Sequence, residues 1–239
     1  MAGTIRKTNS ANTTKNTTRT TTSTTKRRGK GRPVGGQLEI GRDILIETTC
    51  KLLSELPPKN VTRVKVAEEV GVDPSLIRYY FKNRSALLLA AFERLTSEYN
   101  SMLKKEKSNF DSSPEGQLRS RVSALFRLIS TYPHYHRLII EEIAPMDTPE
   151  SRKALQELTG NRLVTYGKII QDGVEANEFR QVDTGLLFIA IIGMANFFTS
   201  GEEVVKIALN KDSLDEEAAS DYQSFICDML LNGLKVRPE

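Results

Sequence analysis

Apolar positions recur at a helical spacing along most of this chain, and no segment alternates in the manner of a β-strand. From about residue 38 to 55 they return every three or four positions, until Pro57 and Pro58 end the pattern. A long helix is expected from Asn83 to about residue 107, with one apolar face made by Leu88, Phe92, Leu95, Tyr99 and Met102. The pattern predicts an all-α fold.

Four or five further helices are predicted after a loop at residues 108–116. One runs from about 149 to 177, and its stripe is formed by Leu155, Leu158, Arg162, Tyr166, Ile169 and Ile170. Residues 186–198 are apolar on every side apart from Asn196, so we expect this helix to be buried all round. The last helix carries a one-sided stripe, which at the end of a chain often packs on a second subunit. Internal packing is the alternative.

Residues 62–84 combine two short helices with a turn. Thr62 is an N-cap residue, and Gly71 can supply the positive φ that a sharp turn requires. Asp73 is expected to cap the second helix, with Pro74 at its first position. Two short helices joined through glycine describe a helix-turn-helix, whose second helix enters the DNA major groove. Helix–glycine–helix corners also occur in ordinary helical domains, so this pattern leaves both readings open.

The sequence of the second short helix narrows the choice. Residues 71–81 read Gly-Val-Asp-Pro-Ser-Leu-Ile-Arg-Tyr-Tyr-Phe, and Lys-Asn-Arg follows. This resembles the TetR family of bacterial transcription regulators, whose pattern is roughly Gly-Val-Ser-x-x-x-Leu-Tyr-x-Tyr-Phe with a Ser-Lys-Glu cap. Asp73 replaces the usual Ser, Arg78 stands where Tyr is frequent, and Ser85 and Ala86 replace an acidic pair. These differences change the chemistry that faces DNA, so an operator sequence cannot be transferred.

The resemblance covers about residues 38–235 and implies three parts. Residues 1–37 would be a basic, Thr-rich tail that is disordered alone, and residues 38–84 a three-helix helix-turn-helix DNA-binding domain. Residues 85–239 would form a helical domain for effector binding and dimerisation. The expected protein is a dimeric regulator, with repression as the expected mode, that a small, mostly apolar ligand releases from a near-palindromic operator. A DNA-binding regulator without small-molecule control is the alternative.

Candidate DNA contacts lie on and beside the second short helix. Arg78 can grip a guanine through O6 and N7, and Tyr79 could meet a thymine methyl or a phosphate. Residues at the start of this helix should also face the groove, while the basic or hydroxyl side chains that flank it are candidates for phosphate contact. The full candidate set in this region is Thr62, Arg63, Asp73, Pro74, Ser75, Leu76, Arg78, Tyr79, Lys82 and Arg84.

The tail adds positive charge next to this region. Residues 1–37 hold nine Lys and Arg residues and no acid, although the whole chain has a net charge of only +4. Residues 26–33 resemble an AT-hook, in which a Gly-Arg-Pro segment enters a narrow A·T minor groove. Arg28, Lys30 and Arg32 are therefore further candidates for DNA contact. A solvated charge run that only aids solubility is the alternative.

Ligand and dimer residues are assigned mainly from the resemblance. The cavity candidates combine apolar walls with a few polar groups: Phe126, Tyr132, His134, Tyr135, Met146, Tyr166, Ile189, Met194, Asn196 and Phe197. Plain core packing is the alternative for any one of them. The dimer candidates come from the last stripe and the all-apolar helix: Leu186, Ile191, Phe198, Tyr222, Phe225, Ile226, Met229 and Leu230.

Nothing in the sequence favours catalysis. The two histidines, His134 and His136, are two residues apart at a helix start, and no spaced carboxylate or cysteine completes a metal set. No Gly-rich phosphate loop occurs. Cys50 and Cys227 are expected to be ordinary small apolar residues. We expect a protein that is not an enzyme, needs no cofactor or metal, has DNA and its own copy as partners, does not enter membranes and is cytoplasmic, on the nucleoid when bound to DNA.

Overall fold

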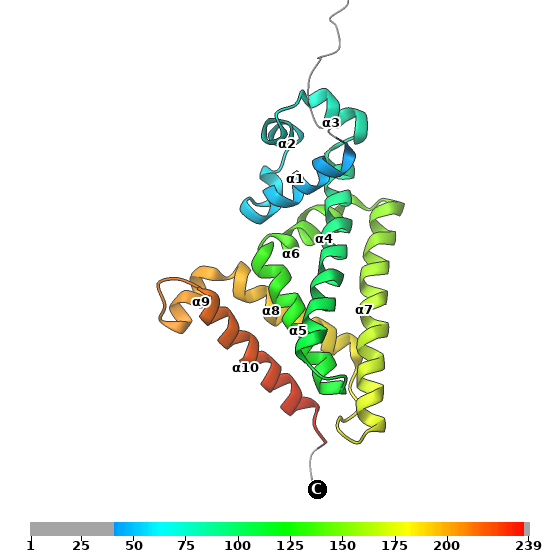
Figure 1. Cartoon of the computed structure of the whole chain (residues 1–239), viewed down its shortest axis with the longest axis vertical. Helices are drawn as coiled ribbons and strands as arrows, with labels where there is room; N and C mark the ends of the chain where they lie inside the picture. Colours follow the sequence, from blue (N-terminus) through cyan, green and yellow to red (C-terminus); the bar gives the residue numbers. More distant parts are fainter. Residues whose placement is uncertain (1–40, 237–239) are drawn as a thin grey trace, which may run out of the picture. The chain divides into compact units, whose positions relative to one another are not determined.

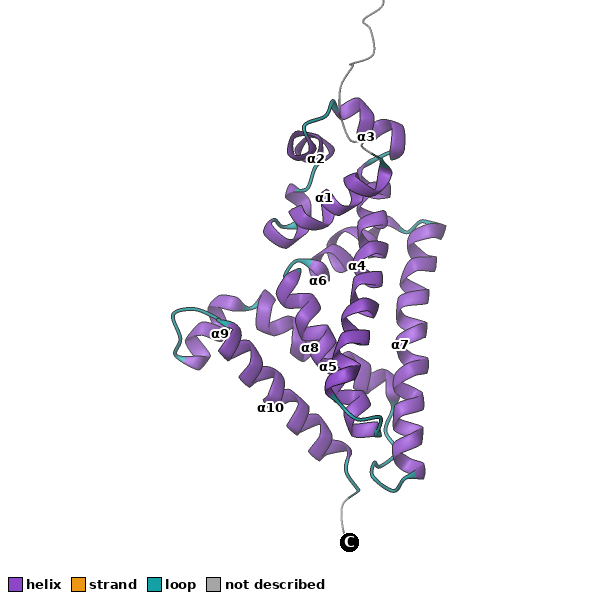
Figure 2. Cartoon of the chain, in the orientation of Figure 1, coloured by secondary structure: helices purple, strands orange, loops and turns teal. Residues whose placement is uncertain are grey.

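The computed structural model describes residues 41–236, and the tail candidates Arg28, Lys30 and Arg32 lie outside this range. The described residues form helices, and their one β-bridge is an isolated pair between Phe179 and Lys235. Figures 1 and 2 show this all-helical arrangement, as the sequence predicted. None of these helices is by itself long and apolar enough to cross a membrane. Helices α8 (Thr184–Ser200) and α9 (Glu202–Leu209) reach that length and apolar composition only when taken together, and an 87° bend separates them.

The first three helices are α1 (Arg42–Glu55), α2 (Arg63–Val70) and α3 (Pro74–Tyr80), with a 3₁₀ turn η1 (Pro58–Asn60) after α1. Each contributes side chains to a shared core. Leu45 of α1, Val66 of α2 and Ile77 of α3 are completely buried there. Val64 of α2, in contrast, is 53% exposed. The three helices therefore share an apolar centre, which is continuous with the core of the following helices.

The ends of α2 and α3 follow the local chemistry predicted from the sequence. The Thr62 hydroxyl accepts a hydrogen bond from the Lys65 amide at 3.1 Å, and the Asp73 carboxylate accepts one from the Ser75 amide at 2.8 Å. Between the helices, Gly71 has φ of 75°, a left-handed conformation in which a Cβ is strained. The two caps and this glycine set where α3 starts and how it is turned against α2.

Helix α4 (Arg84–Glu106) connects this three-helix unit with the rest. The Asn83 side chain caps it by accepting from the Ala86 amide at 2.8 Å. The predicted apolar face is buried, with Phe92 and Leu95 each 1% exposed. α4 packs against α1 near its beginning and against α5 (Pro114–Thr131) further along, after a 3₁₀ turn η2 (Lys107–Asn109). The residues of α4 thus belong to one core that runs from α1 to the last helices.

The segment after α5 departs from regular α-helix. It consists of α6 (Tyr135–Arg137), the π-helical turn η3 (Leu138–Ile143) and a 3₁₀ turn η4 (Ala144–Met146). π-helical turns carry an extra residue per turn and occur frequently at functional sites. Helix α7 (Pro149–Glu175) follows, and Asn177 then adopts the left-handed conformation, with φ of 56°. In Figure 1, α7 runs beside α4.

The chain ends with α8 (Thr184–Ser200), α9 (Glu202–Leu209) and α10 (Glu216–Leu234). Leu187 and Ile191 of α8 face the core, but Leu186, Ile189 and Phe197 are exposed. The prediction that this helix is buried all round is therefore wrong for a single chain. On α10, Ile226 and Leu231 are buried, while Phe225 and Met229 are exposed. We call the exposed set, namely Leu186, Ile189, Phe197, Phe225 and Met229, the α8–α10 face.

Candidate DNA-binding surface and ligand cavity

Helix α3 has a buried side and a side that is accessible to a partner. Ile77 and Phe81 are buried, whereas Arg78 and Tyr79 are exposed and Tyr79 is 80% accessible. The Tyr79 ring meets the Tyr80 ring edge to face, with 5.0 Å between their centres. An exposed guanidinium and an exposed aromatic ring at neighbouring positions match the geometry required of a groove-reading helix.

The start of α3 is polar and accessible. Asp73 and Ser75 are exposed, and Pro74 and Leu76 are half-buried. Hydrogen bonds from Ser75 hold the pKa of the Asp73 carboxyl below its usual range, so this carboxylate is tied to the helix cap. Thr62 and Lys82 are exposed and Arg63 is half-buried, which leaves these three candidates accessible beside α3.

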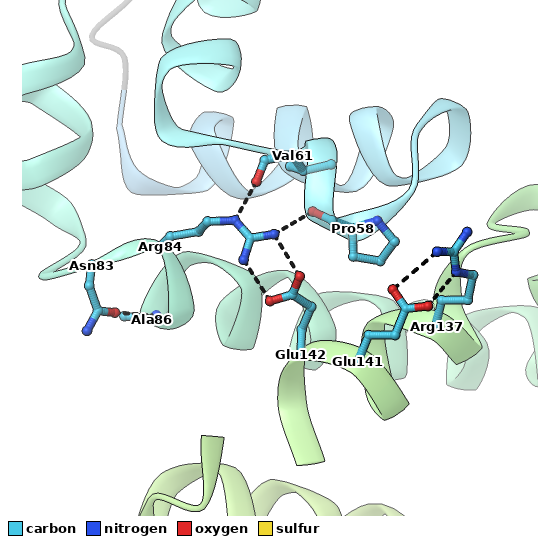
Figure 3. A network of polar contacts seen from close by, with 8 residues as sticks. All are labelled: Pro58, Val61, Asn83, Arg84, Ala86, Arg137, Glu141 and Glu142. Atoms are coloured by element: carbon cyan, nitrogen blue, oxygen red, sulfur yellow. Dashed lines mark hydrogen bonds and ion pairs between the residues drawn. The ribbon is translucent and has the colours of Figure 1, made fainter. Parts of the chain in front are cut away.

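Arg84 has a different role from the phosphate contact that we predicted. Its Nε donates to the Val61 carbonyl at 2.9 Å, and one Nη donates to the Pro58 carbonyl. The two Nη atoms also bind Glu142 of η3 bidentately, at 2.6 and 2.9 Å (Figure 3). Four of the five N–H groups of this guanidinium are therefore used inside the molecule, an arrangement that does not favour the predicted phosphate contact. Sequence reasoning missed this pairing because Glu142 is 58 residues away.

An apolar cavity of about 220 Å³ lies between α4, α5, α6, η3, α7 and α8. Three predicted cavity residues line it: Tyr135, Tyr166 and Asn196. The Tyr135 hydroxyl lies 3.1 Å from the Thr96 hydroxyl, and the Asn196 amide donates to the Ile192 carbonyl at 2.9 Å. Of the two histidines it is His136, not His134, that reaches the cavity, and burial lowers the pKa of His136.

The other seven cavity candidates lie elsewhere. Ile189 and Phe197 point outward on the α8–α10 face. Phe126 packs against Tyr222 with 5.9 Å between ring centres, and the Met194 carbonyl accepts from the Tyr222 hydroxyl. Tyr132, His134 and Met146 do not line the cavity either. The cause is rotation about each helix axis, since a fully apolar helix such as α8 gives no sign of which side faces the cavity.

Several wall residues of the cavity were not predicted from the sequence. They come from helix faces that meet only in the folded chain: Tyr99, Leu125, Ile139, Leu155, Arg162, Phe188 and Ile192. Arg162 had a visible signal, because it is the one charge in the apolar stripe of α7. Its guanidinium carbon lies 3.4 Å from the centre of the Tyr99 ring, a cation–π contact.

The dimer candidates divide into two groups. Leu186, Phe225 and Met229 are exposed, and Tyr222 and Leu230 are half-buried, so these five are accessible along α8 and α10. Ile191, Phe198 and Ile226 are buried within the single chain. The last three are therefore corrected to core residues, because each lies on the inward side of its helix.

The cysteines are buried and free. Burial raises the pKa of Cys50 to about 12 and that of Cys227 to about 11. Neither thiol is a reactive thiolate at neutral pH. Within residues 41–236 there is also no group of three or more His, Cys, Asp and Glu residues that could hold a metal ion.

Comparison with known proteins decides the family. Residues 111–238 match the family model described as the tetracyclin repressor-like, C-terminal domain. This match covers more than half of the chain, and it falls outside the helix-turn-helix that carried the resemblance. The chain belongs to the TetR family of transcription regulators.

Other relatives agree with this TetR-family assignment. The transcriptional repressor NicS of Pseudomonas putida is 22% identical over 202 residues, which span 83% of this chain and 94% of NicS. The transcriptional regulator BetI of Serratia proteamaculans is 30% identical over 95 residues, 39% of this chain and 48% of BetI. These relatives are transcription regulators rather than enzymes.

Solved structures share the fold at low sequence identity. The ketosteroid transcriptional regulator KstR2 of Mycobacterium tuberculosis has a TM-score of 0.62 at 14% identity, over 86% of this chain and all of that one. A regulator of Saccharomonospora viridis in complex with choline has a TM-score of 0.61 at 17% identity, over 82% of this chain and 98% of that one. This TetR-family regulator therefore has the fold of those proteins.

Proposed function

We propose that this TetR-family regulator binds a near-palindromic DNA operator as a homodimer, and that a small ligand in the apolar cavity releases it. Residues 38–84 would bind DNA, and residues 85–239 would bind the ligand and form the dimer. A regulator that lacks small-molecule control is the second candidate. The tail's nine positive charges would add an attraction to phosphate that does not depend on sequence.

The DNA-binding part of the proposal rests on α3. Arg78 and Tyr79 would contact base edges, and Thr62, Arg63 and Lys82 would contact the backbone on either side. In a dimer, two copies of α3 about 34–36 Å apart would enter successive major grooves on one side of the duplex. Repression is favoured because occupied operators block transcription, and because NicS is called a repressor.

The dimer part rests on the α8–α10 face. Its five large apolar side chains are exposed in the single chain. Exposed apolar patches of this kind usually mark an interaction site. A second copy would cover the same residues on both subunits through a two-fold axis. Each phenylalanine or leucine removed from water there would contribute about 1.5–3 kcal/mol.

The observation that carries ligand control is the connection between the cavity and α4. Ile139 and Ile140 of η3 line the cavity, and Glu142 of the same turn binds Arg84, the first residue of α4. Arg84 also holds the carbonyls of Pro58 and Val61, directly before α2. A ligand that moves η3 would therefore move the helices that carry the DNA contacts. If the ligand binds one arrangement of these helices more favourably than the other by about 1.4 kcal/mol, operator affinity changes about tenfold.

The test is selection of bound genomic fragments with the purified full chain, followed by affinity measurement on a selected fragment. A near-palindromic motif is expected. Arg78→Ala should cost about 1–3 kcal/mol and relax the preference at one base in each half-site. Lys211→Ala, an exchange of a basic residue directly after α9, is the matched control and should leave the affinity unchanged. Equal binding of the wild type to selected and scrambled DNA would contradict the proposal.

A further inference from the structure

Two arginines that line one groove beside the cavity have no anionic partner. Arg121 of α5 and Arg162 of α7 both line a groove of about 360 Å³ between α4, α5 and α7. Arg121 is only 7% exposed, and its guanidinium makes one long hydrogen bond, 3.4 Å to the Gln117 carbonyl. Among residues 41–236, no carboxylate lies within ion-pair distance of either arginine.

This arrangement is unfavourable for the protein alone. Buried charges in proteins are normally paired, because removal from water is costly. Burial lowers the pKa of the Arg121 guanidinium, and the positive charge of Arg162 acts in the same direction. The Arg162 guanidinium lies over the Tyr99 ring face, which compensates a cation less than a carboxylate does. An anion placed between the two guanidinium groups would relieve both charges.

The groove and the apolar cavity adjoin one another. Leu158, Arg162 and Tyr166 line both hollows, so Arg162 stands at their junction. Beyond it, the cavity walls are mainly apolar and include Leu125, Ile139 and Phe188. A molecule that fills both spaces would have a charged end at the arginines and an apolar body among these side chains.

Negative charge in the groove is confined to its rim. Glu93 and Glu157 line the groove but are exposed, and Glu157 pairs with Lys153 at 3.7 Å. The buried end of the groove is therefore positive. A cationic ligand would be repelled at the junction, where the Tyr99 ring face is already occupied by Arg162.

We propose that the ligand of this regulator is an amphipathic organic acid, with its carboxylate bound by Arg121 and Arg162 and its apolar body in the cavity. This inference rests on the proposed function and narrows the ligand from a mostly apolar molecule to an anion with an apolar tail. Guanidinium groups suit the role because they bind carboxylates through two parallel, charge-assisted hydrogen bonds.

The experiment compares head groups on the same tail. Calorimetry with the full chain would measure binding of the straight-chain acids from butanoate to decanoate, each against its alcohol and its trimethylammonium analogue. The best acid should bind at least about tenfold more tightly than its alcohol, and the ammonium compound least tightly. Arg162→Gln should abolish the preference for the acid. Lys168→Gln removes an exposed charge from the same helix and should retain it.

Arg121→Gln is a second variant that tests the buried partner, with melting curves to verify that it folds. Loss of the acid preference in either folded arginine variant, but not in Lys168→Gln, supports the proposal. Equal binding of acid and alcohol to the wild type overturns it, as does absence of binding by every acid. Release of a selected DNA fragment is measured separately. If alcohols or ammonium compounds release DNA while acids do not bind, ligand control stands and the anionic ligand is rejected.

Discussion

The three-helix unit α1–α3 and the pair of helices α8 and α10 differ in how far their apolar side chains are buried within one chain. In the first, Leu45, Val66 and Ile77 are fully buried by residues of the same chain. In the second, Leu186 and Phe225 remain 68% and 62% exposed. A helix can therefore be regular and still leave large apolar side chains exposed to solvent. The first region is complete within one chain, and the second has an apolar surface that a second copy would complete.

The largest effect is expected from Phe225→Glu, which tests whether the α8–α10 face is a dimer interface. We expect a folded monomer, because the side chain is exposed in the single chain but would carry a charge into the interface from both copies. Breaking buried pairs or burying a lone charge costs about 3–5 kcal/mol, so two copies should weaken dimerisation by several orders of magnitude. Light scattering over a range of concentrations measures this. Val164→Glu, at a 75% exposed position of α7, is the control and should remain dimeric. A wild-type monomer would contradict the interface.

In the three-helix unit the corresponding change is Ile77→Ala. It should lower the free energy of unfolding by about 2–5 kcal/mol, because a buried side chain leaves a cavity. Tyr79→Ala, two residues later but 80% exposed, should change it by no more than about 0.5 kcal/mol. Denaturant titration compares the two. Equal destabilisation would mean that α3 does not divide into an inward and an outward side.

Glu142→Gln tests the connection between the regions. The Arg84 guanidinium would lose its charged partner, which is partly buried, and stability should fall by about 1–3 kcal/mol. Operator affinity should change and its response to a ligand should weaken. Glu141→Gln, which removes the neighbouring surface pair with Arg137, is the control. If both variants behave alike, the Arg84–Glu142 pair does not connect the cavity with the DNA contacts.

The smallest effect is expected from Thr62→Ala. Loss of the hydrogen bond to the Lys65 amide should cost about 1 kcal/mol by thermal unfolding. Thr62→Ser keeps an oxygen at the cap and should recover most of the loss. If Thr62→Ser is as unstable as Thr62→Ala, the cap is not the source of the effect.

Local chemistry made the ends of α2, α3 and α4 predictable from the sequence. The caps at Thr62, Asp73 and Asn83 and the left-handed Gly71 depend only on residues within four positions. The outward side of α8 was not predictable, because a helix that is apolar all round carries no directional signal. Ile189 and Phe197 were therefore assigned to the cavity, and Ile191 and Phe198 to the interface.

Long-range pairing was the other limit. Arg84 is a basic residue beside the predicted DNA reader, and nothing in its neighbourhood indicates that Glu142 will bind it. The cavity has the same difficulty, since its walls come from six elements whose relative rotations decide each wall residue. Arg162 is the one wall residue that the sequence could have indicated, because a single charge in an apolar stripe suggests a specific role.

The Arg84–Glu142 pair also bears on the construction of hybrid regulators, in which the DNA reader of one protein is joined to the effector domain of another. A junction directly after residue 84 looks convenient, because α4 begins there. Such a junction would separate Arg84 from Glu142, and the guanidinium would keep only the Pro58 and Val61 carbonyls as partners. A hybrid built from this chain should therefore include an acidic residue in the segment equivalent to η3, so that the transplanted reader still responds to its new effector domain.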